Sequence, residues 1–342
     1  MLHAARNYLA RIAKSDRSRF TCMVDFAYHH YALGDALTTQ VIAACLAEES
    51  GCSGVDLVLL LNPERPAAPT QSFITEGNYP LHLENLLPAF LCLPQLLRLR
   101  IVRDRVTPGY VVCSLAASRA PRWPPLRDHL RQHIEWPLDH DIIDRFYKRH
   151  GRIPQLGAPK GYGEWAREFL ARHAAGKYIV AVNPRQSRFS PIPATTYRDS
   201  PLDEWHRFID MAGSRYPEVH FLMLGGFHEW DRTLLRRSNV TVPRTMGLSL
   251  AHELALLVHA NLFLGTSSGF ATMATFTKVP YLISNVEPFF AAFVQVDADA
   301  SRYPFASKNQ TLSWRREDAE LLMAHFESEY RGQRDTPDGG DR

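Results

Sequence analysis

The sequence has no apolar run long enough to cross a membrane, and no apolar core of a signal peptide follows Met1. A spanning helix needs about 20 consecutive apolar residues, so we expect neither an integral membrane protein nor a secreted one. Cysteine is also scarce. The five cysteines all lie in the N-terminal third and none forms a Cys-x-x-Cys pair, which predicts buried free thiols in a reducing compartment. We therefore expect a cytoplasmic protein.

Two further absences narrow the function. The net charge is only +3, whereas nucleic-acid binding usually needs a concentrated basic face. No Gly-x-Gly-x-x-Gly follows a predicted strand and opens a helix, which argues against a redox dinucleotide enzyme. In contrast, 45% of the residues are hydrophobic, and 342 residues suffice for two domains with sizeable cores.

The second half of the chain alternates predicted strands and helices. Between residues 177 and 284 the pattern is βαβαβαβαβ, which predicts a doubly wound parallel sheet. Its last part contains the small-residue turn 265–269, followed by a short apolar helix. The hydroxyls, the glycines and the helix N-terminus of this turn suit a phosphate group. An ordinary capped turn, with Ser267 or Ser268 as the N-cap, is the alternative.

The first half begins with a predicted strand over residues 20–31 and then a helix to about residue 49. Gly34 permits a tight turn between them. Asp35 can cap the helix, or it can point its carboxylate to the edge where the strands end. Residues 56–61 and 97–102 predict further strands. The pattern thus indicates a second sheet of the same class.

Two arginines, Arg185 and Arg188, follow the strand predicted for residues 177–182. Guanidinium groups match phosphate oxygens, so the pair suits a diphosphate; arginines of a mobile surface loop are the alternative. Other patterns are weaker. His129 and His133 have metal-ligand spacing without a third ligand, and the Asp-His-Asp run at residues 139–141 does not follow a hydrophobic strand. We predict no metal site.

The domain limits follow from composition. The stretch 151–163 is rich in Gly, Pro and Lys and predicts a boundary. We expect an N-terminal domain at residues 1–155 and a C-terminal domain at residues 156–312. A helix at residues 313–331 is expected to pack back towards the N-terminal domain, and residues 332–342 to form a disordered tail. Residues 2–19 form a basic amphipathic pattern, which predicts a solvated leading helix or, alternatively, a peripheral membrane contact.

At the level of motifs the chain resembles the bacterial heptosyltransferase-like glycosyltransferases of family 9. That family carries Gly-Asp-x-Leu-x-Thr after its first strand, and residues 34–39 here read Gly-Asp-Ala-Leu-Thr-Thr. The resemblance implies a GT-B fold, with two Rossmann-like doubly wound domains facing a central cleft. It puts the role of base on Asp35, and Gly34, Thr38 and Thr39 on the acceptor side.

The resemblance also implies a donor side. Arg185 and Arg188 would bind the donor phosphates, and the loop after the next strand would bind the nucleoside. The family signature Asp-Thr-Gly-x-x-His is altered: residues 267–269 read Ser-Ser-Gly, and Thr272 stands where the histidine would be. The predicted donor-binding residues are Arg185, Arg188, Gly225, Gly226, Glu229, Met246, Gly247, Ser267, Ser268, Gly269 and Thr272.

These features predict a glycosyltransferase that moves a sugar from a nucleotide-diphosphate donor to a hydroxyl of a glycan, a lipid-linked glycan or a protein. We expect an inverting, metal-independent reaction with no cofactor and no nucleic-acid partner. The arginine-bearing strand end is also similar to that of O-fucosyltransferases, so a GDP-fucose donor is one alternative. A sugar-nucleotide epimerase or hydrolase and a non-catalytic nucleotide-sugar-binding protein are the others.

Overall fold

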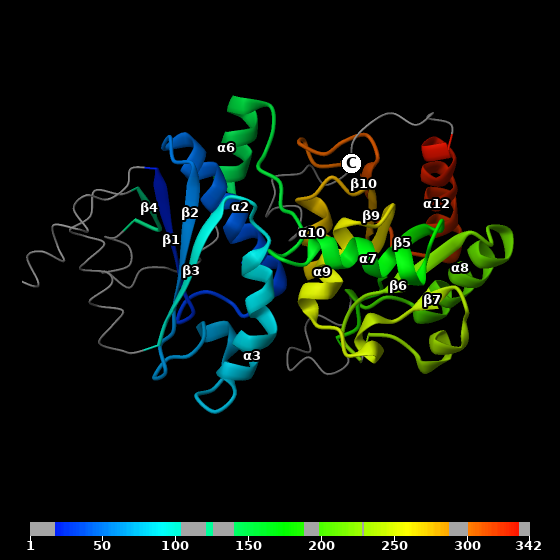
Figure 1. Ribbon diagram of the computed structural model, residues 1–342, viewed down its shortest axis with the longest axis horizontal. Coiled ribbons are helices and arrows are strands. Elements are labelled where there is room, and N and C mark those ends of the chain that lie inside the picture. Colours follow the sequence, from blue (N-terminus) through cyan, green and yellow to red (C-terminus); the bar gives the residue numbers. More distant parts are fainter. Residues whose placement is uncertain are drawn as a thin grey trace, which may run out of the picture. The chain divides into compact units, whose positions relative to one another are not determined.

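The computed structural model describes residues 18–103, 121–125, 140–187, 198–227, 229–286 and 300–334. The chain divides into two compact units, residues 1–156 and 157–342, next to the boundary predicted after residue 155. Each unit contains one parallel sheet flanked by helices (Figure 1). The α/β class with two doubly wound units is therefore as predicted.

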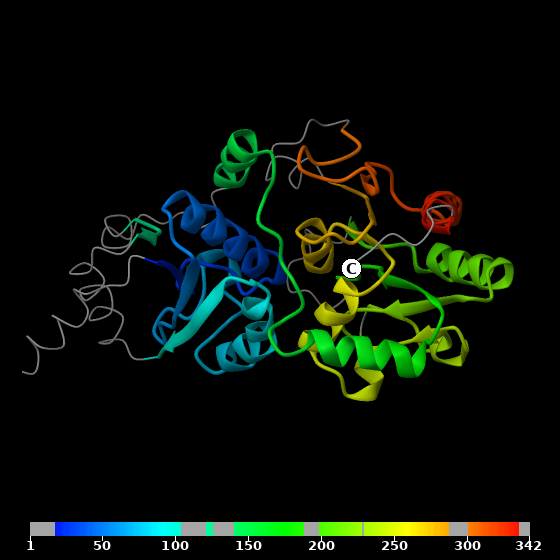
Figure 2. The ribbon, with the colours of Figure 1, turned by 45° about the horizontal axis from the view of Figure 1, so that its top comes forward.

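The first unit has the strand order β3-β2-β1-β4, and every pairing is parallel. Its strands are β1 (Arg19–Asp25), β2 (Gly54–Leu60), β3 (Leu96–Val102) and β4 (Arg122–Trp123). Its helices are α2 (Leu33–Glu49), η1 (Pro69–Gln71), α3 (Tyr79–Leu86), η2 (Leu87–Leu91) and α6 (Asp141–His150), of which the two η elements are 3-10 helices. Helices α2 and α3 lie on the same face of the sheet in Figures 1 and 2.

Strand β1 ends at Asp25, so the prediction of one strand over residues 20–31 is wrong beyond that residue. The carboxylate of Asp25 accepts a hydrogen bond from Ala27 N at 2.9 Å, and its carbonyl accepts one from His29 N at 2.7 Å. These bonds turn the chain. The apolar residues beyond the turn pack on one another, with the rings of Phe26 and Tyr31 stacked at 4.2 Å.

The second unit has the strand order β10-β9-β8-β5-β6-β7, again parallel throughout. Its strands are β5 (Tyr178–Asn183), β6 (Val219–Met223), β7 (Val240–Thr241), β8 (Leu262–Thr266), β9 (Tyr281–Ser284) and β10 (Gln310–Leu312). Its helices are α7 (Gly163–His173), α8 (Leu202–Arg215), η4 (Arg232–Arg236), η5 (Pro243–Met246), α9 (Leu250–Val258), α10 (Gly269–Thr275) and α12 (Ala319–Arg334). The strand order reverses between β5 and β8, which makes that point the switch where open α/β sheets bind ligands.

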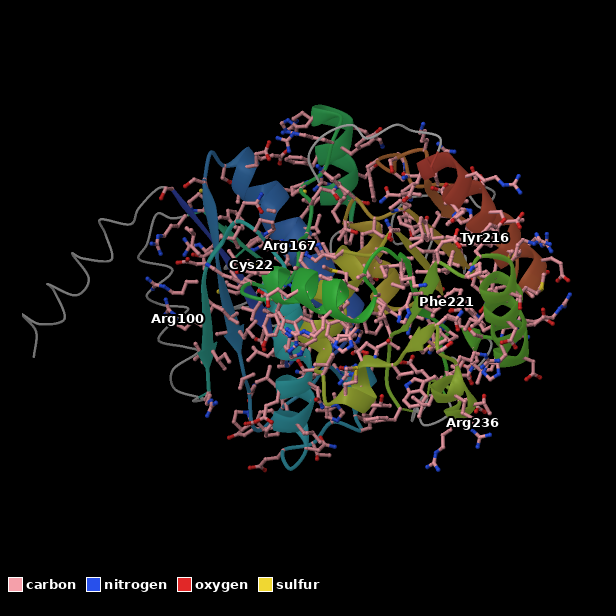
Figure 3. All side chains as sticks on the ribbon, turned by 45° about the vertical axis from the view of Figure 1, so that its right-hand side comes forward. Cys22, Arg100, Arg167, Tyr216, Phe221 and Arg236 are labelled. Carbon is pink, nitrogen blue, oxygen red and sulfur yellow. The ribbon has the colours of Figure 1, made fainter. Side chains whose placement is uncertain are left out.

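Helix α12 packs in the second unit, whereas the sequence suggested packing towards the N-terminal domain. Its apolar face contributes Leu322 and Phe326 to the cluster that also contains Trp205 and Phe208 of α8 and Phe221 of β6. Figure 3 labels Phe221 on this sheet. Helix α12 packs here because it covers aromatic rings of α8 and β6 that would otherwise be exposed to water.

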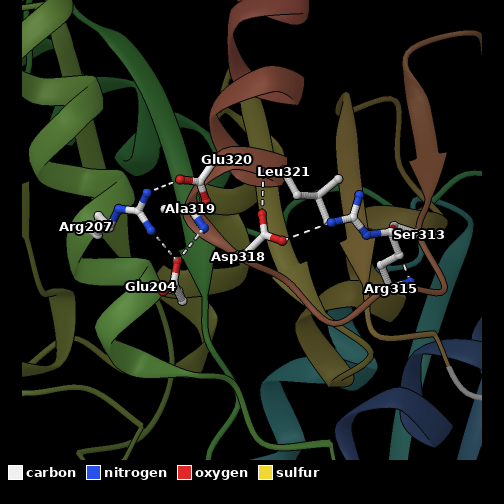
Figure 4. Close-up of polar contacts among 8 residues, drawn as sticks. All are labelled: Glu204, Arg207, Ser313, Arg315, Asp318, Ala319, Glu320 and Leu321. Atoms are coloured by element: carbon white, nitrogen blue, oxygen red, sulfur yellow. Dashed lines mark hydrogen bonds and ion pairs between the residues drawn. The ribbon is translucent and has the colours of Figure 1, made fainter.

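Polar contacts fix the start of α12 against α8 (Figure 4). The carboxylate of Glu204 accepts a hydrogen bond from Ala319 N at 2.8 Å, and Arg207 pairs with both Glu204 and Glu320. Deeper in the unit, Trp205 Nε1 donates to the buried Glu317 at 3.1 Å. The first turn of α12 is thus held by groups that α8 supplies.

The cysteines of the described residues are buried thiols that form no disulfide, as predicted: Cys22, Cys45, Cys52 and Cys92. Burial raises the pKa of the Cys22 thiol well above its usual value, because the thiolate would lie without water inside the sheet (Figure 3). These thiols therefore act as packing groups.

Candidate functional site

In the first unit, the predicted acceptor-side residues lie in the first two turns of α2. Thr38 Oγ1 donates to the carbonyl of Gly34 at 2.9 Å, and Thr39 Oγ1 lies 2.8 Å from Nε2 of the buried His29. Both threonines are buried, so their hydroxyls serve the helix and His29. Of the four predicted residues, Asp35 keeps a carboxylate partly exposed to solvent, at 21%.

Asp35 is held by a histidine that the sequence analysis missed. His30 Nδ1 lies 3.0 Å from Asp35 Oδ2, and its other ring nitrogen, Nε2, lies 2.5 Å from Thr70 Oγ1 of η1. A third histidine, His140, lies at the start of α6; burial lowers its pKa to about 4, and the charge of Asp35 acts in the opposite direction. The His29-His30 pair, a few residues before Asp35, was the available signal.

In the second unit, a set of side chains meets at the carboxyl ends of β5, β6 and β8. We call it the strand-end cluster: Asn183, Gly225, Glu229, Glu253 and Ser268. Asn183 closes β5 and is fully buried. Its Nδ2 donates to the carbonyl of Leu224 at 2.9 Å, and its Oδ1 accepts from Ser268 Oγ at 2.8 Å. One amide thus joins three strand ends at the switch point.

Two carboxylates line the glycine loop of this cluster. Gly225 N donates to Glu253 Oε1 at 3.0 Å, and Gly226 N donates to Glu229 Oε2 at 2.7 Å. Burial raises the pKa of each carboxyl group to about 7, against the opposing effect of nearby arginines. Glu253 lies on α9 and pairs with Arg244 of η5 at 2.6 Å. Glu229 was predicted from sequence; Glu253 and Arg244 were missed, since only the tertiary fold brings them to the loop.

Arg185 lies two residues after the end of β5, as predicted. Its Nη1 pairs with Asp199 Oδ1 at 3.0 Å, and Asp199 also accepts from the backbone and hydroxyl of Ser187. Burial raises the pKa of Glu229 and the charge of Arg185 opposes that rise, so the two predicted donor residues act on one another. Arg188 lies outside the described residues. The ion pair with Asp199 orients the planar guanidinium of Arg185.

The turn between β8 and α10 is capped by one of its own serines. Ser268 is the N-cap of α10 and accepts from Ala271 N, and Ser267 Oγ donates to the carbonyl of Asn285 at 3.1 Å. Thr272 Oγ1 donates back to the carbonyl of Ser268. Ser268 is thus the helix cap that the sequence offered as one reading, and the phosphate role of Ser267, Ser268 and Thr272 stays a prediction. Gly269 is the first residue of the helix.

Met246 and Gly247 end η5, on the loop that also carries Arg244. The side chain of Met246 is 47% exposed to solvent. Gly247 has φ +76, the left-handed conformation that favours glycine, and it closes the turn through its N–H to the carbonyl of Arg244. An exposed apolar side chain thus lies two residues from the arginine that pairs with the strand-end cluster.

Replacing Gly225 by alanine is expected to destabilise the second unit by about 1–3 kcal/mol. Gly225 has φ +120, and an added Cβ would overlap Glu229 Oε2 and lie 2.9 Å from Asn183 Nδ2. Gly51→Ala is the matched control, because Gly51 has φ +70 with open space around it. Urea denaturation of both variants separates backbone strain from the steric clash, and equal losses would contradict a crowded cluster.

Neither a metal site nor a membrane span is found in the part of the chain that the structure describes. Among those residues, no group of three or more His, Cys, Asp or Glu side chains could hold a metal ion. No described helix is both long and apolar enough to cross a bilayer. Two groups of predicted residues lie outside the part of the chain that the structure describes. One is the leading helix up to residue 17, and the other consists of His129, His133 and Asp139.

Comparisons with known proteins find relatives at the level of structure. No family model matches the chain, and neither does any curated protein. The chain is similar to the glycosyl transferase family 9 from Veillonella parvula DSM 2008, with a TM-score of 0.56, 12% identity, and coverage of 93% of this chain and 98% of that one. It is also similar to the E. coli ADP-heptose lps heptosyltransferase II, with a TM-score of 0.54, 10% identity, and coverage of 93% and 99%.

These comparisons confirm the predicted resemblance to family 9 glycosyltransferases at the level of the fold. The order of strands in both units agrees with a GT-B-like α/β architecture.

Proposed function

We propose that this protein is a glycosyltransferase that moves a sugar from a nucleoside diphosphate donor to an acceptor hydroxyl. The observation that carries the proposal is the strand-end cluster, where the glycine loop, Glu229 and the nearby Arg185 converge at the switch point of a doubly wound sheet. This is where folds of this class hold nucleotides. The GT-B-like architecture supports transfer of a sugar over other nucleotide chemistry.

The donor would be bound through groups of three kinds. Arg185 would contact the diphosphate, which carries the negative charge that develops as the bond to the sugar breaks. Glu229 would accept hydrogen bonds from the ribose hydroxyls. The exposed Met246 would contact the base, since an apolar side chain suits an aromatic ring.

The acceptor would bind at the first unit, next to Asp35. The negative charge of the Asp35 carboxylate would promote removal of the proton from the acceptor hydroxyl. The acceptor oxygen would then attack the sugar C1 with inversion. No metal is needed in this proposal, because Arg185 supplies the positive charge at the leaving group. The acceptor is a glycan, a lipid-linked glycan or a protein.

Binding of a nucleoside diphosphate tests the proposal. Thermal unfolding with GDP, UDP, ADP, CMP and dTDP, each with and without magnesium, is expected to give a clear upward shift with one diphosphate. A GDP shift would favour a fucosyl-type donor, and an ADP shift a heptosyl-type donor. Arg185→Met is expected to weaken that binding by about ten- to a hundredfold, because a charge-assisted contact contributes about 1.5–3 kcal/mol.

Arg172→Met is the matched control, because Arg172 is exposed in the last turn of α7. Its binding should equal that of the wild type. If no diphosphate shifts the unfolding temperature, the transferase proposal is wrong. If the donor is split without any acceptor, or bound without turnover, the protein is a hydrolase or a binding protein.

A further inference from the structure

The geometry around Asp35 points to His30 as the catalytic base, with Asp35 as the group that orients it. We propose that His30 Nε2 takes the proton from the acceptor hydroxyl; the inference rests on the proposed transferase function. The proton then goes to His30 Nε2 and not to the Asp35 carboxylate. Three observations on the first unit support this assignment.

The first observation is the order of the three groups. Asp35 Oδ2 lies 3.0 Å from His30 Nδ1, and His30 Nε2 lies 2.5 Å from Thr70 Oγ1. A carboxylate cannot donate, so Nδ1 carries the proton of that bond and Nε2 presents a lone pair to the hydroxyl. This is the arrangement in which serine hydrolases place a histidine between an orienting carboxylate and the hydroxyl that it deprotonates.

The second observation concerns access. The side chain of His30 is 15% exposed, so an acceptor hydroxyl can reach the ring while the surrounding residues hold its orientation. The neighbouring His29 is buried, and both of its ring nitrogens are used, by Thr39 and by the carbonyl of His30. His29 therefore holds the backbone of the turn that presents His30.

The third observation concerns the hydroxyl already in place. Thr70 Oγ1 marks a point at hydrogen-bonding distance from Nε2 that an alcohol oxygen can occupy. The turn and η1 are tied together independently of this bond, because Tyr31 N donates to Gln71 Oε1 at 2.7 Å. An acceptor hydroxyl can thus replace that of Thr70 without loss of the local fold.

The step balances as follows. The acceptor oxygen forms a bond to the sugar C1, while its proton moves to His30 Nε2. The bond between C1 and the diphosphate oxygen breaks, and its electron pair leaves with the nucleoside diphosphate. The imidazolium is stabilised by the Asp35 carboxylate and then releases the proton to solvent. The histidine takes part in proton transfer, and the aspartate stays ionised throughout.

Turnover and donor binding of matched histidine variants test the inference. The assay is the release of nucleoside diphosphate from the donor, with the nucleotide-induced rise in unfolding temperature as a separate readout. His30→Gln is expected to lower kcat by about 10²–10⁴-fold, the usual contribution of a general base, and to leave the nucleotide-induced shift unchanged. His150→Gln at the end of α6 is the control and should keep wild-type turnover.

Added imidazole provides the readout that a structural histidine would not move. His30→Ala is expected to recover turnover by roughly tenfold or more when free imidazole fills the vacated space and acts as the base. His30→Gln within about threefold of wild type, or His30→Ala without rescue, would overturn the assignment. A wild-type protein that binds the nucleotide and never releases it from a donor would overturn the proposed function along with this inference.

Discussion

Replacing Arg244 by methionine is expected to lower the free energy of unfolding by about 3 kcal/mol near pH 8 and by about 1–2 kcal/mol near pH 5.5. Arg244 Nε lies 2.6 Å from Glu253 Oε2, and the Glu253 side chain is fully buried, whereas that of Arg244 is 26% exposed. Methionine keeps most of the apolar stem of the arginine. It leaves the buried carboxylate without its counter-charge, which is the costly way to break such a pair.

The dependence on pH follows from the protonation of Glu253. Burial raises the pKa of this group from 4.5 to about 7, and Arg244 opposes the rise. Without Arg244 the native-state pKa rises further, so the native state keeps a proton that the unfolded state releases. The stability of the variant is therefore greatest below the unfolded-state pKa and is lost as the pH rises through the native-state pKa.

Urea denaturation at both pH values measures the effect as the difference from the wild type, since Glu229 also faces Glu253 and titrates in both proteins. Measured against Glu253→Gln alone, the effect of Arg244→Met on stability should not depend on pH. Arg315→Met is the control, because Arg315 and Asp318 are 70% and 37% exposed and such a pair contributes about 0–1 kcal/mol. A loss that is the same at both pH values would show that Glu253 stays neutral.

The fold was predictable because hydrophobic periodicity records it directly. Each strand of the second unit up to β9 coincides with a predicted apolar run, and parallel pairing follows from the alternation with helices. Two parts did not follow this rule. Strand β10 has three residues, too few for a periodic signal, and Phe26 and Tyr31 stack on one another in the turn behind Asp25 instead of extending the strand.

The sequence predicted which strand ends carry the candidate site, but it did not predict every residue that contributes to it. Parallel strands collect their carboxyl ends at one edge, so Arg185, Gly225 and Glu229 were expected near each other. The residues that hold them come from distant parts of the chain: Glu253 bonds to a glycine 28 positions away. A capping serine and a phosphate-binding serine give the same local pattern, and the contact of Ser268 with Ala271 shows the cap.

Phe326→Ala is expected to lower the free energy of unfolding of the second unit by about 3–5 kcal/mol. Phe326 is fully buried on α12 and meets the rings of Tyr178 and Phe208 edge-on at 6.0 and 6.1 Å. Its removal takes away apolar burial and leaves a cavity between α12, α8 and the sheet, because neighbours anchored on three elements cannot collapse into it together.

Hydrogen exchange of the intact protein locates this loss. Amides of β5 and β6 should exchange faster in Phe326→Ala, while those of β1 and β2 keep wild-type protection, since α12 packs in the core of the second unit. Leu235→Ala is the matched control: Leu235 is 50% exposed in η4, so its loss should stay within about 0.5 kcal/mol. Faster exchange in β1 and β2 would instead show that α12 stabilises the first unit, as first predicted.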